Sequence, residues 1–400
     1  MKDELELYIH IPFCAKKCNY CDFLSFRTIP SVHKAYIEKL REELRYNSEL
    51  CRDRMISSIY IGGGTPSLLE PKLIEAVMRE VRENYDVDRD AEISIECNPG
   101  STMRHKFAAY KNAGINRLSI GLQSANNEEL RTLGRIHSFE EFLKCYQGAR
   151  MEGFSNINVD LINCIPGQTA ATWKKTLKNI VMLKPEHISV YNLIIEPGTP
   201  FYRMNEDGLL ELPDEDTDEE IDEFTASCLK QAGFERYEIS NWAKPSYECR
   251  HNIGYWTEKE YLGVGLGAAS FFEDRRFSVT RDLMSYLELD FGAPDIKERL
   301  YTEKKELTRE EEMEEFMFLG LRMTRGISST DFLVRFKVRM DSVYGEQLEK
   351  FTSLKLMVKD GYRYRLTDRG MDVSNLIMSE FLLSDEKKEE LNANKIQEEA

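Results

Sequence analysis

The sequence has no run of about 18 apolar residues, the length that a membrane-spanning helix needs, although 42% of its residues are hydrophobic. It also lacks the basic start and apolar stretch of a secretory signal peptide, because residues 1–6 are acidic on balance and lead directly into an apolar strand. We therefore expect a cytoplasmic protein. Its 400 residues suggest two domains, or one large domain with a small one attached.

Negative charge outweighs positive charge, and the cysteines cannot all pair with one another. The formal net charge is −16, which argues against nucleic acid as the main partner. The nine cysteines are an odd number, and in a reducing cytosol we expect thiols rather than a disulfide framework. Three of them cluster near the N-terminus, and we expect most of the other six to be small buried apolar residues.

Strand-like and helix-like segments alternate through the first 200 residues. The expected strands are residues 5–11, 57–61, 91–96, 117–120, 156–162 and 187–193. The expected helices between them are residues 32–50, 72–84, 101–113, 139–152 and 171–183. This alternation predicts parallel strands joined by helical crossovers, in an open sheet or a barrel. Polar or glycine-rich clusters follow most of the strands, so we expect a shared site at their carboxyl ends.

The second half of the chain has a different pattern. Residues 213–223 are strongly acidic and suggest a surface segment, and residues 237–270 are rich in aromatic residues and glycine. Later segments read as three helices and a hairpin that turns at Asp360-Gly361, which resembles a winged-helix module; they cover residues 304–321, 329–336, 341–353 and 356–366. The tail, residues 385–400, is polar and charged, and we expect it to be frayed or disordered.

A compact cysteine motif follows the first expected strand, with Cys14, Cys18 and Cys21 in one loop. Thiolates ligate iron–sulfur clusters, and four normally complete a cubane, so three leave one iron without a protein ligand. Catalytic metal sites keep such a position open for an outside molecule. Two alternatives stay open here: a zinc site that adds His10 to the three cysteines, and three structural cysteines that are close by coincidence.

The spacing Cys-x3-Cys-x2-Cys in this position resembles the radical S-adenosylmethionine (SAM) superfamily. The resemblance implies a [4Fe–4S] cluster whose open iron binds the amino and carboxylate groups of SAM, followed by reductive cleavage to methionine and a 5′-deoxyadenosyl radical. Residues 62–66, Gly-Gly-Gly-Thr-Pro, end the second strand and resemble the motif that holds the methionyl amino group of SAM. The alternative for this segment is an ordinary tight turn.

Four further side chains stand at or near the ends of later strands: Glu96, Gln123, Arg135 and Asp160. A carboxylate at a strand end can accept hydrogen bonds from ribose hydroxyls. Taken singly, each has a plainer interpretation, such as a solvated acid, a surface arginine or a helix-capping aspartate. Because they occupy consecutive loops of the βα array, we expect them to converge on one face.

The order of these motifs resembles the oxygen-independent coproporphyrinogen III oxidase group over nearly the whole chain. The resemblance implies an α/β fold, an incomplete (β/α)6 radical SAM barrel with a mainly helical, winged-helix-like C-terminal domain. It implies a barrel at 1–235, an extension that completes this core at 236–299, the C-terminal domain at 300–384 and the tail at 385–400. The SAM contacts that it implies are Tyr8, Tyr20, Gly63, Gly64, Thr65, Glu96, Gln123, Arg135, Asp160 and Ile194. The true oxidases bind two SAM molecules, so the number bound here stays open.

Two departures point to a sister family, the haem chaperones of the HemW type. The oxidases carry a fourth cysteine two residues after the third, where this chain has Phe23, and their N-terminal extension is longer than the 13 residues that precede Cys14. A third departure is Cys164, where relatives usually have glycine, and we interpret it as structural.

Residues 251–256, His-Asn-Ile-Gly-Tyr-Trp, match the HNxxYW motif of that sister family. By this resemblance His251, Asn252, Tyr255 and Trp256 are haem-binding candidates, since imidazole is a common axial ligand and the two large rings could pack on a porphyrin. The alternative is a buried histidine inside an aromatic loop. His137 is a lesser candidate.

The resemblance therefore implies a haem chaperone that binds haem, a [4Fe–4S] cluster and SAM and passes haem to an acceptor protein. It implies no coproporphyrinogen oxidase activity, although oxidative decarboxylation of propionate side chains is the main alternative, and a radical SAM enzyme with another substrate is a third. We expect the C-terminal domain to act as a lid or a docking surface rather than to bind nucleic acid. A monomer or a dimer, and peripheral membrane association through the acceptor, remain open.

Overall fold

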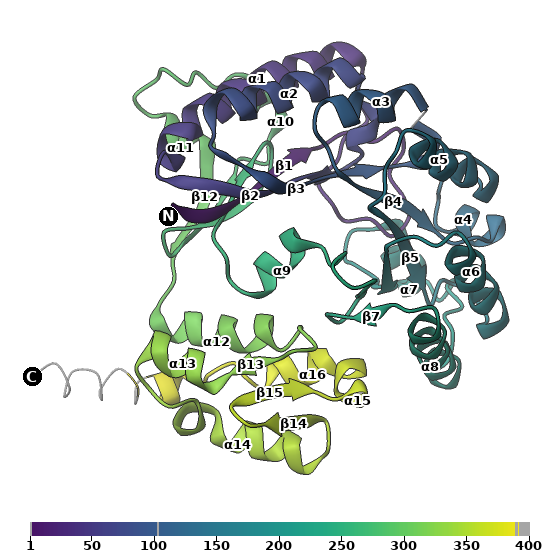
Figure 1. The fold of residues 1–400 in the computed structure, drawn as a ribbon, viewed down its shortest axis with the longest axis vertical. Coiled ribbons are helices and arrows are strands. Elements are labelled where there is room, and N and C mark those ends of the chain that lie inside the picture. Colours follow the sequence, from purple (N-terminus) through teal and green to yellow (C-terminus); the bar gives the residue numbers. More distant parts are fainter. Residues whose placement is uncertain (1, 102–103, 389–390, 392–400) are drawn as a thin grey trace, which may run out of the picture.

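The computed structural model describes residues 2–101, 104–388 and 391. Most of the predicted tail, 385–400, lies outside these residues. Figure 1 shows a large unit built on a sheet and a smaller unit at the C-terminal side, and each has its own apolar core.

Six parallel strands form the centre of a twelve-stranded sheet and lie side by side in chain order. They are β1 (Asp3–Ile11), β2 (Arg54–Gly63), β3 (Val87–Cys97), β4 (Arg117–Gln123), β5 (Ile157–Asn163) and β6 (His187–Asn192). Their central residues are buried, as expected for parallel strands that are covered on both faces. All six predicted strands are confirmed, and the structure extends most of them by a few residues.

Helices connect these strands and cover the outer face of the sheet (Figure 1). They are α1 (Pro30–Ser48), α2 (Pro71–Asn84), α3 (Arg104–Asn112), α4 (Asn127–Thr132), α5 (Phe139–Met151) and α6 (Ala170–Met182). Capping boxes at Ser138 and Thr169 fix where α5 and α6 begin. The five predicted crossover helices are confirmed, and α4 is an additional short one.

Later segments extend the same sheet at both edges. On one side β9 (Tyr261–Val264) pairs in parallel with β1 and is followed by β10 (Ala269–Phe272), β11 (Arg275–Val279) and β12 (Tyr301–Glu306). On the other side, β8 (Asn241–Ala243) and β7 (Glu235–Arg236) follow β6. The helices of this region are α7 (Pro200–Glu206), α8 (Glu215–Gln231), α9 (Arg250–Trp256), α10 (Leu283–Leu287) and α11 (Ile296–Leu300).

One predicted helix, residues 304–321, is wrong at its start. Residues 304–306 belong to β12, where Glu306 and Lys305 pair with Arg275 and Arg276 of β11. The helix begins only after Thr308, whose side chain forms a capping box with Glu311. The acidic segment at 213–223 is largely exposed, as expected for a surface segment, and residues 215–223 form the start of α8. Asp214 caps that helix, and the acidic residues in its first turn stabilise it through the positive end of the helix dipole.

The smaller unit contains helices around a three-stranded sheet with the order β13-β15-β14. Its elements are α12 (Arg309–Gly320), β13 (Ile327–Ser328), α13 (Ser329–Phe336), α14 (Met340–Ser353), β14 (Met357–Asp360), β15 (Arg363–Leu366), α15 (Asp368–Asp372) and α16 (Ser374–Ser379). The predicted hairpin is confirmed, and Gly361 supplies the positive φ of its turn. Phe332, Phe336 and Tyr344 lie at the centre of its core.

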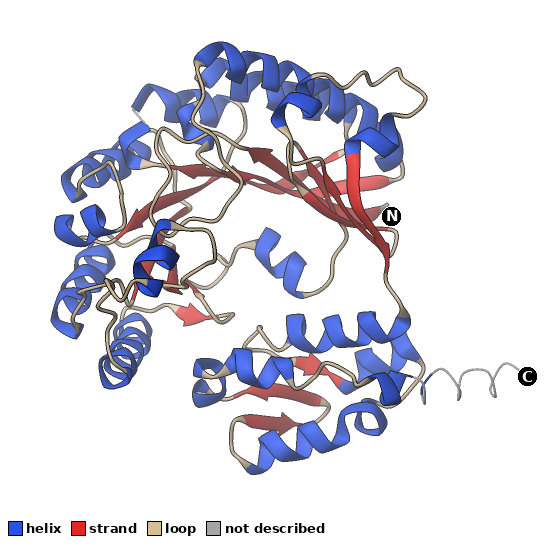
Figure 2. Cartoon of the chain, turned by 180° about the vertical axis from the view of Figure 1, so that it is seen from behind, coloured by secondary structure: helices blue, strands red, loops and turns tan. Residues whose placement is uncertain are grey.

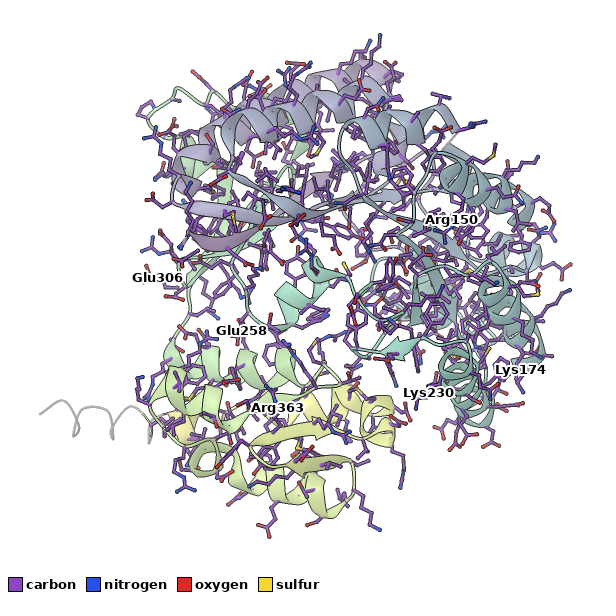
Figure 3. The ribbon with its side chains drawn as sticks, viewed as in Figure 1. Arg150, Lys174, Lys230, Glu258, Glu306 and Arg363 are labelled. Atoms are coloured by element: carbon purple, nitrogen blue, oxygen red, sulfur yellow. The ribbon has the colours of Figure 1, made fainter. Side chains whose placement is uncertain are left out.

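The smaller unit faces the concave side of the curved sheet, with α9 between them (Figures 1 and 2). Glu258, just after α9, forms an ion pair with Arg335 of α13, with 2.8 Å between Oε2 and Nη1. Figure 3 shows Glu258 between the two units. Arg276 of β11 pairs with Glu315 of α12 at 2.6 Å. Among the described helices, none is both long and apolar enough to cross a membrane.

Candidate functional site

A cavity of about 1560 Å³ lies at the carboxyl ends of the parallel strands. The loop after β1, the ends of β2 to β6, and helices α8, α15 and α16 all contribute to its walls. Parallel strands bring their carboxyl ends to one edge of a sheet, and this is where α/β folds bind ligands. The cavity therefore lies where the polar clusters of the sequence predict a site.

Most of the predicted site residues meet in this cavity. Its lining includes all three motif cysteines and nine of the ten predicted SAM contacts, namely Tyr20, Gly63, Gly64, Thr65, Glu96, Gln123, Arg135, Asp160 and Ile194. Tyr8 is the exception. Its hydroxyl contacts His10 Nδ1 at 3.0 Å, and its ring stacks 6.4 Å from that of Tyr60, which does line the cavity. Tyr8 thus lies one layer behind the wall.

The cysteine loop is fixed by backbone hydrogen bonds. The amide of Cys14 donates to the Phe26 carbonyl at 3.0 Å, and the amide of Asn19 donates to the Leu133 carbonyl at the end of α4. All three cysteines are free thiols and are partly exposed. Burial, reinforced by the neighbouring Cys18 and Cys14, raises the pKa of Cys21 to about 11.

The donor set in this loop fits the iron–sulfur cluster that the sequence predicts. Three thiols on one short loop face a cavity with room for an outside ligand. Within the described part of the chain, no three His, Cys, Asp or Glu side chains stand close enough to share one metal ion, but each cysteine of a cubane binds a separate iron. The zinc alternative needs His10, and both nitrogens of that ring contact other groups, the Tyr8 hydroxyl and the Leu24 carbonyl.

The glycine-rich end of β2 brings backbone amides to the cavity wall. Gly63 has a φ of 111°, and a Cβ there would lie 2.5 Å from the His10 ring, so only glycine fits. Its amide donates to Glu96 Oε2 at 3.1 Å, and the hydroxyl of Tyr60 donates to Glu96 Oε1 at 3.2 Å. The sequence analysis missed Tyr60, although its position on β2, two residues before the glycines, could have indicated it.

Glu96 and Asp160 face the cavity from neighbouring parts of the sheet. Burial and the charge of Asp160 raise the pKa of Glu96 to about 8, so near neutral pH its carboxyl group is mainly protonated and can donate as well as accept. The Ser119 hydroxyl donates to Asp160 Oδ2 at 2.8 Å, and the side-chain amide of Asn158 donates to Asp160 Oδ1 at 2.7 Å. Together they offer oriented oxygens to a polyhydroxylated ligand such as a ribose.

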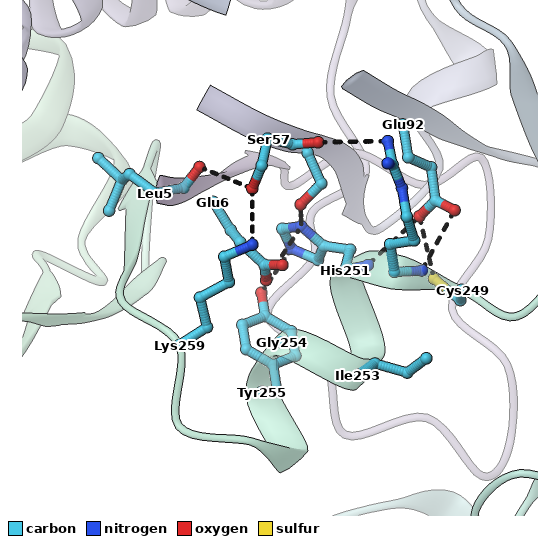
Figure 4. Close-up of polar contacts among 12 residues, drawn as sticks. Leu5, Glu6, Ser57, Glu92, Cys249, His251, Ile253, Gly254, Tyr255 and Lys259 are labelled. Carbon is cyan, nitrogen blue, oxygen red and sulfur yellow. Dashed lines mark hydrogen bonds and ion pairs between the residues drawn. The ribbon is translucent and has the colours of Figure 1, made fainter. Parts of the chain in front are cut away.

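The HNxxYW segment forms α9 and lies apart from this cavity. His251 is 1% exposed; its Nδ1 contacts the Ser58 hydroxyl at 2.8 Å and its Nε2 contacts the Tyr255 hydroxyl at 2.9 Å (Figure 4). Its ring stacks 5.3 Å from Tyr60, and the Glu6 carboxylate lies 3.6 Å away. Burial, and the charges of Arg117 and Lys259, lower the pKa of His251 to about 3, so the ring is neutral.

Haem binding by these residues stays a prediction, and their placement bears on how it could occur. The structure gives His251 the environment of a buried histidine, bonded to side chains rather than to the backbone, and its imidazole has no free nitrogen for iron. Asn252 and Tyr255 are half-buried, and Trp256 stacks under the Arg322 guanidinium, 4.2 Å from the ring centroid. Within the described residues, none of the four haem candidates lines the cavity. His137 is also buried, with Nε2 against the Leu122 carbonyl.

An acidic group on α8, which the sequence analysis placed on the surface, also reaches the cavity. Asp218 and Asp222 line it, and burial together with Asp218 raises the pKa of Asp222 to about 6. Cys164 donates from Sγ to Asp218 Oδ1 at 2.8 Å. Cys164 has a φ of 55°, a left-handed conformation that glycine adopts most easily.

Two family models match the chain. The radical SAM superfamily model matches residues 8–180, and the HemN C-terminal domain model matches residues 307–373. Among solved structures, coproporphyrinogen III oxidase HemN of Escherichia coli, described as a radical SAM enzyme, superimposes with a TM-score of 0.81 at 26% identity, covering 95% of this chain and 90% of that one.

Several curated relatives match over nearly their whole length. The haem chaperone HemW of Lactococcus lactis is 35% identical, covering 94% of this chain and 97% of that protein. HemW of Bacillus subtilis is 33% identical over 94% of this chain and 98% of that protein. The mitochondrial radical S-adenosyl methionine domain-containing protein 1 of Danio rerio is 31% identical, covering 95% of this chain and 87% of that protein. With a matching cysteine loop, fold and full-length similarity, the chain belongs to the radical SAM superfamily and, within it, to the HemW family.

Proposed function

We propose that this protein is a haem chaperone, which binds haem and transfers it to an acceptor protein. The observation that carries the proposal is similarity to haem chaperones along almost the entire chain, including the HemW protein of Lactococcus lactis at 35% identity. Phe23 supports it. It stands where the oxidases have a fourth cysteine, and it is 63% exposed at the wall of the cavity. We further propose a cytoplasmic location.

Cys14, Cys18 and Cys21 hold the [4Fe–4S] cluster in this proposal, and the glycines after β2 together with Glu96 hold SAM. When bound, the cluster supplies an electron to SAM. The chain's own contribution is to fix the ligand: the Gly63 amide orients Glu96, and Ser119 and Asn158 orient Asp160. Tyr20, from the loop after β1, and Ile194, from the loop after β6, also line the cavity.

Haem binding at the HNxxYW segment requires a rearrangement of α9. For His251 to ligate iron, its imidazole must exchange the Ser58 or the Tyr255 hydroxyl for the metal. Exposing the ring also separates α9 from the Glu6 side of the sheet and from Arg322 of the smaller unit. We therefore propose that haem is bound with α9 displaced, and that the smaller unit, which contacts α9, moves with it or offers the surface for the acceptor.

A second candidate function is oxidative decarboxylation of coproporphyrinogen III. The fold favours it, because coproporphyrinogen III oxidase of Escherichia coli superimposes with a TM-score of 0.81. Its sequence identity of 26% is lower than that of the haem chaperones, and Phe23 replaces the additional cysteine. These two observations rank it second.

Anaerobic reconstitution of the cluster followed by two assays separates the candidates. We expect haem binding, seen as a shifted Soret band, and haem transfer to a haem-free acceptor, without conversion of coproporphyrinogen. His251→Ala is expected to weaken haem binding, whereas His105→Ala, at an exposed histidine of α3, serves as the matched control. Steady decarboxylation of coproporphyrinogen without haem transfer would reverse the ranking.

A further inference from the structure

Arg135 carries a partly buried positive charge that has no carboxylate partner among the described residues. Its side chain lines the cavity, Nη2 donates to the Gly121 carbonyl at 2.8 Å, and Nη1 donates to Cys18 Sγ at 3.6 Å. The third nitrogen, Nε, is buried without a hydrogen-bond partner. Burying part of a guanidinium is costly unless an anion lies close to it, and Cys18 supplies that counter-charge once it is a thiolate ligand of the cluster.

The backbone holds this guanidinium in place. Gly134 has a φ of 77°, and a Cβ there would lie 2.9 Å from Asn19 Oδ1, so the turn that leads into Arg135 packs directly against the cysteine loop. At the other end, a Cβ on Gly121 would lie 3.5 Å from Arg135 Nη2. The charge is therefore positioned between the end of β4 and the cysteine loop rather than free to swing into solvent.

A second polar group contacts a different cysteine. The hydroxyl of Thr65 lies 3.4 Å from Cys14 Sγ, and Thr65 is 8% exposed. A thiolate has no proton, so only the hydroxyl can donate once Cys14 is a metal ligand. Two of the three cysteines of the motif thus have a hydrogen-bond donor that comes from another loop.

We propose that Arg135 and Thr65 set the reduction potential of the cluster through hydrogen bonds to Cys18 and Cys14. Each electron added to an iron–sulfur cluster increases its negative charge, and hydrogen bonds to the sulfurs together with nearby positive charge stabilise the reduced form. Arg135 supplies both and Thr65 supplies a hydrogen bond alone, so Arg135 has the larger effect. Both are also among the SAM contacts implied by resemblance, but here they act as positioning residues through the cysteine sulfurs, and the inference rests on the proposed cluster.

The test is a redox titration of the reconstituted full chain in the absence of SAM. The EPR signal of the reduced cluster, measured at each potential, gives the midpoint potential. We expect Arg135→Gln to shift the midpoint potential to more negative values, Arg135→Lys to shift it less because the charge stays, and Thr65→Val to shift it by a smaller amount than Arg135→Gln. Thr65→Ser keeps the donor and is expected to match the wild type. Arg131→Gln, on α4 with a side chain 72% exposed, is the charge-matched control.

Iron content and the EPR line shape show whether each variant retains its cluster. An unchanged potential in Arg135→Gln with an intact cluster overturns the inference for Arg135, and an unchanged potential in Thr65→Val does so for Thr65. If Arg135→Gln does not retain a cluster, the midpoint potentials of Arg135→Lys and Thr65→Val test the inference instead. A wild-type protein that holds no cluster overturns the proposed function itself, which is a different result from a cluster with an unshifted potential.

Discussion

The cysteine loop and the α9 segment carry the two most specific motifs of the sequence, yet the first is accessible from a cavity and the key histidine of the second is buried. The three cysteines are partly exposed at a cavity, at the carboxyl edge of a parallel sheet. His251 is 1% exposed under the same sheet, with both ring nitrogens bonded. One region is open to a ligand as it stands, and the other is closed by the protein's own side chains.

Glycines allow close packing in both regions, so the difference lies in what surrounds each site. At the end of β2, a Cβ on Gly63 would overlap the His10 ring and one on Gly64 the Phe13 backbone, while the Glu96 carboxyl group that the Gly63 amide contacts lines the cavity. In α9, a Cβ on Gly254 would overlap the Glu6 carboxylate, so the absence of a side chain brings the helix against the sheet and His251 is buried. A ligand can enter the first region directly, whereas the second must open before it can bind one.

Removing the three cysteines is the largest change that separates the regions. We expect Cys14→Ala, Cys18→Ala and Cys21→Ala together to abolish the visible absorption of the cluster and its EPR signal, because the thiolate ligands are lost. Folding of α9 should be unaffected, measured as hydrogen exchange of its amides. Cys228→Ala, at a half-buried thiol of α8, is the control and should keep the cluster. A cluster that survives the triple change would refute its assignment to this loop.

Filling the contact between α9 and the sheet tests the closed region. Gly254→Ala places a methyl group against the Glu6 carboxylate, and we expect a loss of roughly 1–3 kcal/mol in the free energy of unfolding, as is typical of overpacking. Gly345→Ala is the matched control. A Cβ there meets nothing within 4 Å, so we expect no loss of stability.

Gly254→Ala also has an expected effect on haem. If haem is bound with α9 displaced, a helix that is already strained against Glu6 opens more readily, and haem association should be faster than in the wild type. Stopped-flow mixing with haem measures this rate. A lower stability together with a slower association rate would mean that His251 binds haem from the closed conformation, or that it does not bind haem at all.

The sequence predicted the open region much better than the closed one. Strand ends, glycines and cysteines in fixed order are local signals, and nine of ten predicted SAM contacts line one cavity. The sequence offered a buried His251 only as an alternative and could not name its partners, because Ser58 and Glu6 lie about 200 residues or more away in the sequence and only the sheet brings them to α9. Strand β12 was missed for the same reason: its pairing with β11 overrides the helical pattern of residues 304–306.

The buried carboxyl group beside His251 makes the closed region sensitive to pH. Burial raises the pKa of Glu6 to about 8, while Lys259 and a hydrogen bond from Ser58 lower it and Glu92 and Glu4 raise it further. An unfolded chain releases this proton near pH 4.5 and the folded chain near pH 8, so the stabilising contribution is complete below pH 4.5 and is lost as the pH rises through 8. We expect Glu6→Gln, which stays neutral, to lose less stability between pH 5 and 8 than the wild type, by at most about 1.4 kcal/mol per pH unit.

Denaturant titrations at several pH values measure this difference. Subtracting the two curves matters because Glu43, whose pKa burial raises to about 7, contributes a slope of the same sign in both proteins. Parallel curves for the wild type and Glu6→Gln would show that water reaches the Glu6 carboxylate and that α9 is less tightly closed than its contacts indicate.

The smallest expected effect concerns the link between α9 and the smaller unit. Arg335→Met removes the partner of Glu258, whose side chain is 5% exposed, while the arginine itself is 32% exposed. Burial already raises the pKa of Glu258 to about 7, and losing the arginine raises it further, so near neutral pH the carboxyl group takes up a proton rather than remaining a bare charge. We therefore expect a loss of only about 1 kcal/mol in the free energy of unfolding and faster hydrogen exchange at the end of α9.

The control is Arg339→Met, at a side chain 78% exposed, which should leave the stability and the exchange unchanged. Exchange that is faster in α9 but unchanged around the cysteine loop would show that the closed region opens independently of the open one, whereas equal changes in both would mean that the two regions move together.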